Sequence, residues 1–151
     1  MNGAVPVFAD IDERTFCLDP VSVRKNITPR TKAIMVVNLF GCTADFYELL
    51  KISKEHNVKI IEDNAQGPGA KYKGKYAGTI GDIGIFSSNV NKVIQSGEGG
   101  VLVTNNSDYA LRAQMCRNHG EIYADQDPNY SLGPLIGSNY RMTEIEAVIS
   151  Y

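Results

Sequence analysis

The sequence predicts an α/β domain built on a mostly parallel sheet flanked by helices, and three observations support this fold class. The chain has 151 residues, the length of one ordinary domain, and its 43% hydrophobic and 21% charged residues are average for a globular protein. Short apolar runs alternate with helical patterns along the chain. Nothing in the sequence separates two domains, and no internal repeat is visible.

The first half of the chain predicts strands and helices in alternation. Apolar runs of strand length occupy residues 5–12, 33–39 and 58–61. After the first run, Asp19 can cap a short helix with Pro20 at its first position, where proline is well tolerated, and Pro29 ends that segment. Residues 45–56 show an amphipathic helical pattern, with Lys and Glu side chains on the polar side.

The second half continues with a ribbon, two strands and a helix. Residues 71–77 predict a tight ribbon that turns at Lys73-Gly74, and strand patterns occupy residues 83–86 and 100–104. Ser107 is expected to cap a helix that ends near residues 118–120, and a polar loop continues from there to Met142.

The last predicted helix begins at a capping box, the Thr-x-x-Glu pattern of Thr143 and Glu146. Its expected apolar face consists of Ile145, Val148 and Ile149. The sequence stops at Tyr151, soon after this helix begins and without a C-cap, which is unusual for a natural terminus. We therefore expect residues 1–151 to be part of a longer protein.

Composition excludes several classes of protein. The net charge of −2 gives no basic surplus for nucleic acid or an anionic membrane, and no apolar run approaches the ~20 residues of a membrane span. The start of the chain lacks the features of a signal peptide, so a cytoplasmic location is expected. The three cysteines are scattered, which predicts reduced, buried thiols, and with two separated histidines no metal site is expected.

Candidate site residues follow the predicted strands, because ligands of parallel sheets bind at the carboxyl ends of the strands. Asn38 follows the second strand, and the 58–61 strand is followed by residues 62–66, which include Glu62, Asp63, Asn64 and Gln66. Ser87 and Lys92 follow the 83–86 strand. The glycine-rich run 95–100 comes next, where the backbone can approach a ligand closely.

One motif is a false lead. Residues 69–76 nearly match the phosphate-binding loop G-x-x-x-x-G-K-[ST], but Tyr76 stands where the magnesium-binding hydroxyl should be. The segment also precedes no predicted helix, so no helix N-terminus faces a phosphate. We therefore do not expect nucleotide hydrolysis.

The remaining residues suit pyridoxal phosphate, which needs a lysine for covalent attachment, an acid beside its ring nitrogen and donors around its phosphate. Asp63 can keep the ring nitrogen protonated, since an opposite charge favours the charged form, and Lys92 can supply the amine. Taken singly, each residue has a more ordinary explanation: a turn former for Asp63, a solvated lysine for Lys92 and a strand-end hydroxyl for Ser87. Their order and spacing favour the cofactor site.

In this order the motifs resemble the DegT/DnrJ/StrS family of sugar aminotransferases. The segments that carry the resemblance are residues 6–12, 61–66, 81–87, 97–100, 117–120 and 139–144, together with Lys92. The resemblance implies the large domain of fold type I pyridoxal-phosphate enzymes. It also implies transfer of an amino group from glutamate or a similar donor to a nucleotide-linked keto-sugar.

The resemblance implies a role for each site residue. Lys92 would be the Schiff-base lysine and the proton shuttle, and Asp63 would pair with the ring nitrogen. Gln66 would lie by the ring hydroxyl oxygen, and Ser87 would contact the phosphate. Asn139 would reach the cofactor phosphate of a neighbouring subunit, which implies a homodimer with a shared active site. The motif at residues 117–120 is expected to be structural.

The sequence also departs from the family. Ser88 replaces a usual aromatic residue, and residues 89–91 replace a commoner His-Pro-Thr-like stretch, which would alter either the substrate pocket or its packing. A related dehydratase branch carries histidine at the position of Lys92, so the lysine favours the aminotransferase branch. The family's upstream phosphate-binding segment, its ring-stacking aromatic residue and its C-terminal small domain have no counterpart here.

These departures leave alternatives to a working aminotransferase. Residues 1–151 would form a partial cofactor-binding domain, expected to be inactive by itself. The first alternative is a non-catalytic remnant that keeps the fold without productive cofactor binding. A regulatory protein is the other, but neither a helix-turn-helix pattern nor a basic patch supports it.

Overall fold

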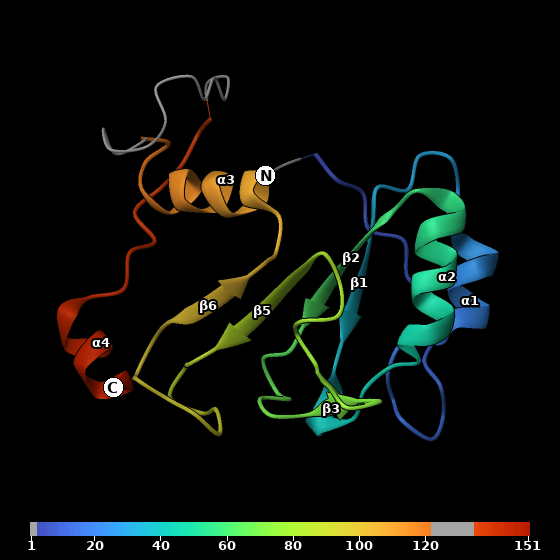
Figure 1. The fold of residues 1–151 in the computed structure, drawn as a ribbon, viewed down its shortest axis with the longest axis horizontal. Coiled ribbons are helices and arrows are strands. Elements are labelled where there is room, and N and C mark those ends of the chain that lie inside the picture. Colours follow the sequence, from blue (N-terminus) through green and yellow to red (C-terminus); the bar gives the residue numbers. More distant parts are fainter. Residues whose placement is uncertain (1–2, 122–134) are drawn as a thin grey trace.

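The computed structural model describes residues 3–121 and 135–151 and contains one mixed four-stranded sheet and one small ribbon (Figure 1). The elements in chain order are α1 (Pro20–Asn26), β1 (Ala33–Val37), the 3-10 turn η1 (Leu39–Gly41), α2 (Phe46–His56), β2 (Lys59–Asp63), β3 (Lys71–Tyr72), β4 (Lys75–Tyr76), β5 (Ile83–Ser87), β6 (Gly100–Val103), α3 (Ser107–Arg117) and α4 (Glu144–Ser150).

The sheet has the strand order β1-β2-β5-β6. The first three strands are parallel, and β6 joins β5 in the antiparallel direction. Val37 of β1 lies opposite Asp63 of β2, and Asp63 lies opposite Ile85 of β5. The predicted fold class, a mostly parallel sheet flanked by helices, is therefore confirmed.

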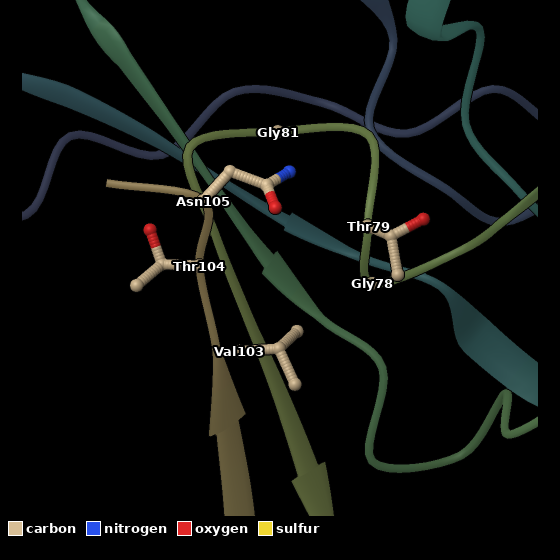
Figure 2. Close-up of a pocket in the computed structure, with 6 residues that line it drawn as sticks. All are labelled: Gly78, Thr79, Gly81, Val103, Thr104 and Asn105. Atoms are coloured by element: carbon tan, nitrogen blue, oxygen red, sulfur yellow. The ribbon is translucent and has the colours of Figure 1, made fainter. Parts of the chain in front are cut away.

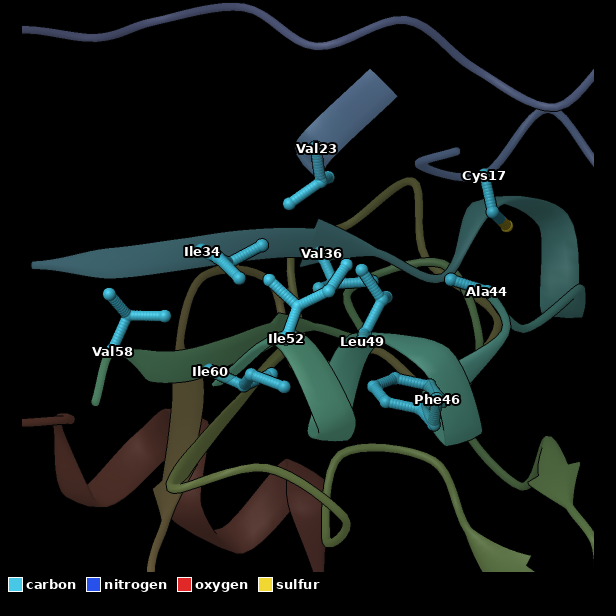
Figure 3. Packing of buried hydrophobic residues seen from close by; sticks show 10 residues of the cluster. All are labelled: Cys17, Val23, Ile34, Val36, Ala44, Phe46, Leu49, Ile52, Val58 and Ile60. Atoms are coloured by element: carbon cyan, nitrogen blue, oxygen red, sulfur yellow. The ribbon is translucent and has the colours of Figure 1, made fainter. Parts of the chain in front are cut away.

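The hydrophobic core lies between the sheet and the helices α1 and α2 (Figure 3). Its buried members are Cys17, Val23, Ile34, Val36, Ala44, Phe46, Leu49, Ile52, Val58 and Ile60. Strand side chains alternate between the two faces of a sheet, so Ile34 and Val36 face this core. Met35 and Val37 lie on the opposite face and are exposed.

The helix signals in the sequence are confirmed at two starts, those of α1 and α4, and α2 begins one residue after its predicted start. Asp19 caps α1 by accepting from the backbone N–H groups of Val21 and Ser22, and Asp45 caps α2. Thr143 and Glu146 form the predicted capping box of α4. The start of α3 differs by one residue, because Asn106 is the cap and Ser107 is the first helical residue.

One prediction about an apolar segment is wrong. Residues 5–12 form no strand: apart from an isolated bridge between Ile11 and Leu18 they pair with nothing, and Val5 and Phe8 are 84% and 89% exposed. An apolar run becomes a strand only beside a partner strand, and this one lies outside the sheet. The last helix is a different case: its predicted apolar residues Ile145 and Val148 are exposed and pack against no core residue that the structure describes.

The cysteines follow the prediction in part. All three are free, but only Cys17 is buried, where burial raises the pKa of its thiol, and Cys42 is exposed. Within residues 3–121 and 135–151, no helix combines the length and apolar character that a membrane span requires. The same residues contain no group of three or more His, Cys, Asp or Glu side chains suited to a metal ion.

Candidate active site at the carboxyl edge of the sheet

Asp63 and Ser87 lie on the same face at the carboxyl edge of the sheet. Asp63 is the last residue of β2, and Ser87 is the last residue of β5. Asp63 is opposite Ile85, and Ser87 is two residues further along β5, so the alternation of side chains places both on one face. This face is the one turned away from α1 and α2. The register thus brings together two of the predicted site residues.

The Asp63 carboxylate is half-buried and keeps one oxygen free. Its Oδ1 accepts a hydrogen bond from the backbone N–H of Ala65 at 3.0 Å, which fixes the turn after β2. Oδ2 meets no hydrogen-bond donor among the residues that the structure describes. Gln66 follows in the same turn and is exposed. An anchored carboxylate with one free oxygen is suited to holding a cationic ring nitrogen.

Lys92 lies in a loop over residues 88–99 that leaves β5 and returns to β6. The base of this loop is closed by the Ser88 N–H, which donates to the carbonyl of Gly99 at 3.0 Å, and by the Ser96 N–H, which donates to the carbonyl of Ser88 at 2.8 Å. Lys92 itself is half-buried, and in the described part of the chain its ammonium group pairs with no carboxylate. The amine is thus available to a ligand at this edge.

Asn139 is held in a segment that pairs with the end of α3. It forms an antiparallel bridge with Asn118, and its Oδ1 accepts from the Arg141 N–H at 3.4 Å. None of the hydrogen bonds described joins its side chain to Asp63, Gln66, Ser87 or Lys92. The segment nevertheless reaches the glycine run, because a Cβ on Gly99 would lie 2.4 Å from Cε of Met142.

Two polar residues that the sequence places after β2 turn into the protein instead. Glu62 and Asn64 are completely buried, because they share the core-facing side of β2 with Ile60. Glu62 accepts hydrogen bonds from the backbone N–H groups of Gly78, Ile80 and Gly81 and from the amide of Asn38. The rule that strand ends deliver ligand-binding groups therefore holds only for every second residue.

The loop before β5 lies directly over the sheet at this point. A Cβ on Gly84, the residue opposite Glu62, would lie 1.8 Å from the carbonyl oxygen of Gly78, so only glycine permits this approach. The hydrogen bonds of Glu62 to this loop hold the loop against β2. Glu62 was expected only as one of the polar residues that follow the strand, and the signal for its inward orientation is the period-two alternation along β2, which places it with Ile60.

A small cavity of about 80 Å³ lies at the opposite edge of the sheet (Figure 2). Its lining residues come from the loop before β5 and from the end of β6: Gly78, Thr79, Gly81, Val103, Thr104 and Asn105. None of these side chains is titratable. The cavity is therefore separate from the candidate site.

The side chains at the carboxyl edge fit pyridoxal phosphate. Within residues 3–121 and 135–151, they provide a carboxylate with a free oxygen, a lysine without an ionic partner, and the Ser87 hydroxyl. The Ser87 oxygen accepts from the Asn89 N–H at 3.3 Å, which leaves its own proton free to donate to an anion. These groups match the acid, amine and phosphate donor that the cofactor requires.

The model of the DegT/DnrJ/EryC1/StrS aminotransferase family matches residues 1–151. Similar curated proteins include GDP-perosamine synthase of Caulobacter vibrioides, which is 45% identical over 97% of this chain and 38% of its own length. L-glutamine:2-deoxy-scyllo-inosose aminotransferase of Streptomyces kanamyceticus is 43% identical over 97% of this chain and 36% of its own length. The chain thus spans little more than a third of these relatives.

Solved structures show the same relationship. An aminotransferase from Psychrobacter cryohalolentis superposes with a TM-score of 0.88 at 38% identity, over 98% of this chain and 39% of that one. The GDP-4-keto-6-deoxy-D-mannose-3-dehydratase of E. coli, solved with bound hydrated pyridoxal phosphate, superposes with a TM-score of 0.80 at 33% identity, over 95% of this chain and 40% of that one.

Proposed function

Because this chain belongs to the DegT/DnrJ/EryC1/StrS aminotransferase family, we propose that the protein transfers an amino group from glutamate or a similar donor to a nucleotide-linked keto-sugar with pyridoxal phosphate. The observation that carries this proposal is the shared placement of Asp63 and Ser87 on one face of the sheet edge, with Lys92 in the loop that follows. Lys92 also favours amino transfer over the dehydratase branch, to which one of the similar structures belongs.

In this proposal each residue has one task. The Lys92 amine holds the cofactor covalently and later carries a proton on Nζ. The Asp63 carboxylate holds the proton on the ring nitrogen, and Gln66 lies by the ring hydroxyl oxygen. Ser87 binds the phosphate, and Asn139 binds the phosphate at the site of a second subunit. The cofactor supplies an electron sink for carbanion chemistry.

The relatives suggest two classes of acceptor. GDP-perosamine synthase is named for a nucleotide sugar, which supports a nucleotide-linked keto-sugar as acceptor. Several other relatives are named as glutamine:2-deoxy-scyllo-inosose aminotransferases, and they support a ketone on a carbocyclic ring, with glutamine as donor, as a second candidate. We place the enzyme in the cytoplasm as a homodimer, and we expect residues 1–151 alone to be inactive because they span so little of the relatives.

Borohydride reduction of the full-length gene product with pyridoxal phosphate, followed by peptide mapping, tests the site. The pyridoxyl label is expected on Lys92, and a label on Lys71 or Lys75 would contradict the assignment. Turnover is then measured with glutamate and glutamine against a GDP-linked keto-sugar and 2-deoxy-scyllo-inosose. A protein that takes up no cofactor would be the non-catalytic remnant.

A further inference from the structure

The loop over residues 88–99 has a second tie besides its closed base. The Nδ2 group of Asn89 donates to Oε1 of Glu98 at 2.7 Å, and an isolated bridge joins Asn89 to Gly97. This contact spans the loop from its first turn to its last. Lys92 lies between the two ends, so the tie restricts the part of the loop that carries the lysine.

Asn89 also contacts the residues on both sides of it. Its carbonyl accepts from the Lys92 N–H at 2.9 Å, and its Oδ1 accepts from the Asn91 N–H at 3.2 Å. Its own N–H donates to Oγ of Ser87 at 3.3 Å. One half-buried residue therefore links the end of β5, the backbone of Lys92 and the far side of the loop.

From these contacts we infer that Asn89 is a positioning residue that sets the place of Lys92 through its hydrogen bond to Glu98. The inference rests on the proposed function, in which Lys92 holds the cofactor. The amide suits this task because it donates to a carboxylate with Nδ2 while accepting from a backbone N–H with Oδ1. The departure at residues 89–91 from the commoner family sequence thus supplies the internal hydrogen bonds of the loop.

Hydrogen bonds at the base of the loop give a structural role to Ser88, the other residue that departs from the commoner family sequence. The Ser96 hydroxyl, 1% exposed, donates to Oγ of Ser88 at 2.9 Å. A Cβ on Gly99 would lie 2.7 Å from that same Ser88 oxygen, so the hydroxyl pair is packed against the glycine run. Ser88 therefore holds the base of the loop, and Asn89 holds the two sides of the loop together.

An exchange of the two partners tests the inference in the full-length protein. Asn89→Asp places two carboxylates against each other, and Asn89→Ala removes the donor without adding charge. The double variant Asn89→Asp/Glu98→Gln restores one donor and one acceptor in reversed order and keeps the charge of the loop. Asn105→Asp, in an exposed loop after β6, is the matched control for the added charge.

Two measurements report the position of Lys92. In the cofactor-free protein, hydrogen exchange of the Lys92 amide is expected to rise about tenfold in both single variants at Asn89, the effect of losing one hydrogen bond to a charged group. In the cofactor-loaded protein, the pH midpoint of the visible absorbance should move in both. The double variant should recover both readings, and Asn105→Asp should change neither.

Unchanged exchange in Asn89→Ala, or no recovery in the double variant, would overturn the inference. Faster exchange with an unmoved pH midpoint would also overturn it, since the tie would then hold the loop without setting the lysine. Absence of cofactor uptake by the unmodified protein is a separate result: it refutes the proposed function, and with it the role of Asn89 in cofactor attachment, while the exchange measurement still decides whether Asn89 holds the Lys92 backbone.

Discussion

Replacement of Glu62 by alanine tests how much the hydrogen bonds between β2 and the loop before β5 contribute to the stability of the fold. The Glu62 carboxylate is completely buried and accepts from the backbone N–H groups of Gly78 and Ile80 at 2.5 Å and of Gly81 at 2.6 Å. Alanine would remove the acceptor, while the three donors stay in the loop that covers it. No other described acceptor is placed to replace it, so these N–H groups would lose their partners.

The expected loss is large against the stability of a domain. A buried donor left without a partner costs about 1–3 kcal/mol, so three donors correspond to about 3–9 kcal/mol. Two of the three, at Ile80 and Gly81, are only half-buried and can recruit water, which favours the lower half of that range. A domain has a net stability of ~5–15 kcal/mol. Glu62→Ala should therefore unfold a large fraction of the protein or bring it close to unfolding.

Urea unfolding of the full-length gene product, followed by circular dichroism, measures this loss. Glu62→Gln should lie between the wild type and Glu62→Ala, because its remaining oxygen can still accept while its NH₂ group faces a donor. Glu13→Ala, at an exposed loop glutamate, is the control and should leave the unfolding midpoint unchanged. A loss below about 1 kcal/mol in Glu62→Ala would refute the reasoning, since that is less than one unsatisfied donor.

Three further predictions concern the proposed site and the last helix. Asp63→Asn should lower turnover more than cofactor content, because an amide cannot hold the ring proton; equal turnover would reduce Asp63 to a turn residue. Mixing Lys92→Ala and Asn139→Ala subunits should restore activity through one intact shared site per hybrid dimer, and no rescue despite confirmed subunit exchange would exclude sharing. Backbone and side-chain hydrogen bonds from Thr143 lower the pKa of Glu146 below 4.5. The helix stabilisation should therefore be complete above the unfolded pKa and lost as the pH falls through the folded one; in Thr143→Val, which loses the hydroxyl donor but keeps the backbone N–H donor, NMR titration should show the Glu146 pKa moved part of the way back to its ordinary value.

The parts of the fold that local chemistry decides could be predicted. The amphipathic pattern of residues 45–56 gave α2 to within one residue, and the Thr143 capping box predicted the start of α4. The Lys73-Gly74 turn gave the ribbon β3–β4, since both residues adopt a left-handed conformation there. The strand predicted at residues 5–12 does not form. Whether an apolar run becomes a strand depends on a partner strand, and that partner lies far along the chain.

In the candidate site, too, the features set by local sequence were predictable and those set by distant contacts were not. The sequence indicated that Asp63 and Ser87 follow strands, and the register of β2 and β5 adds that the two side chains lie on one face. It did not show that Glu62 turns into the protein, because the orientation of Glu62 depends on the phase of β2 relative to the core. The contact between Asn89 and Glu98 could not be foreseen either, because nothing local determines which residues meet across a loop.

The direction of β6 sets the route of the chain beyond it. The strands β1, β2 and β5 all end at the edge that carries the candidate site, whereas β6 starts there and leads away from it to α3 (Figure 1). Met142 nevertheless lies against Gly99, so the segment before α4 meets the chain just before the start of β6 at this edge. Because side chains alternate along β6, deletion of one of its four residues would reverse the face on which the following residues lie and shift them by one strand step, roughly 3.3 Å, relative to β5.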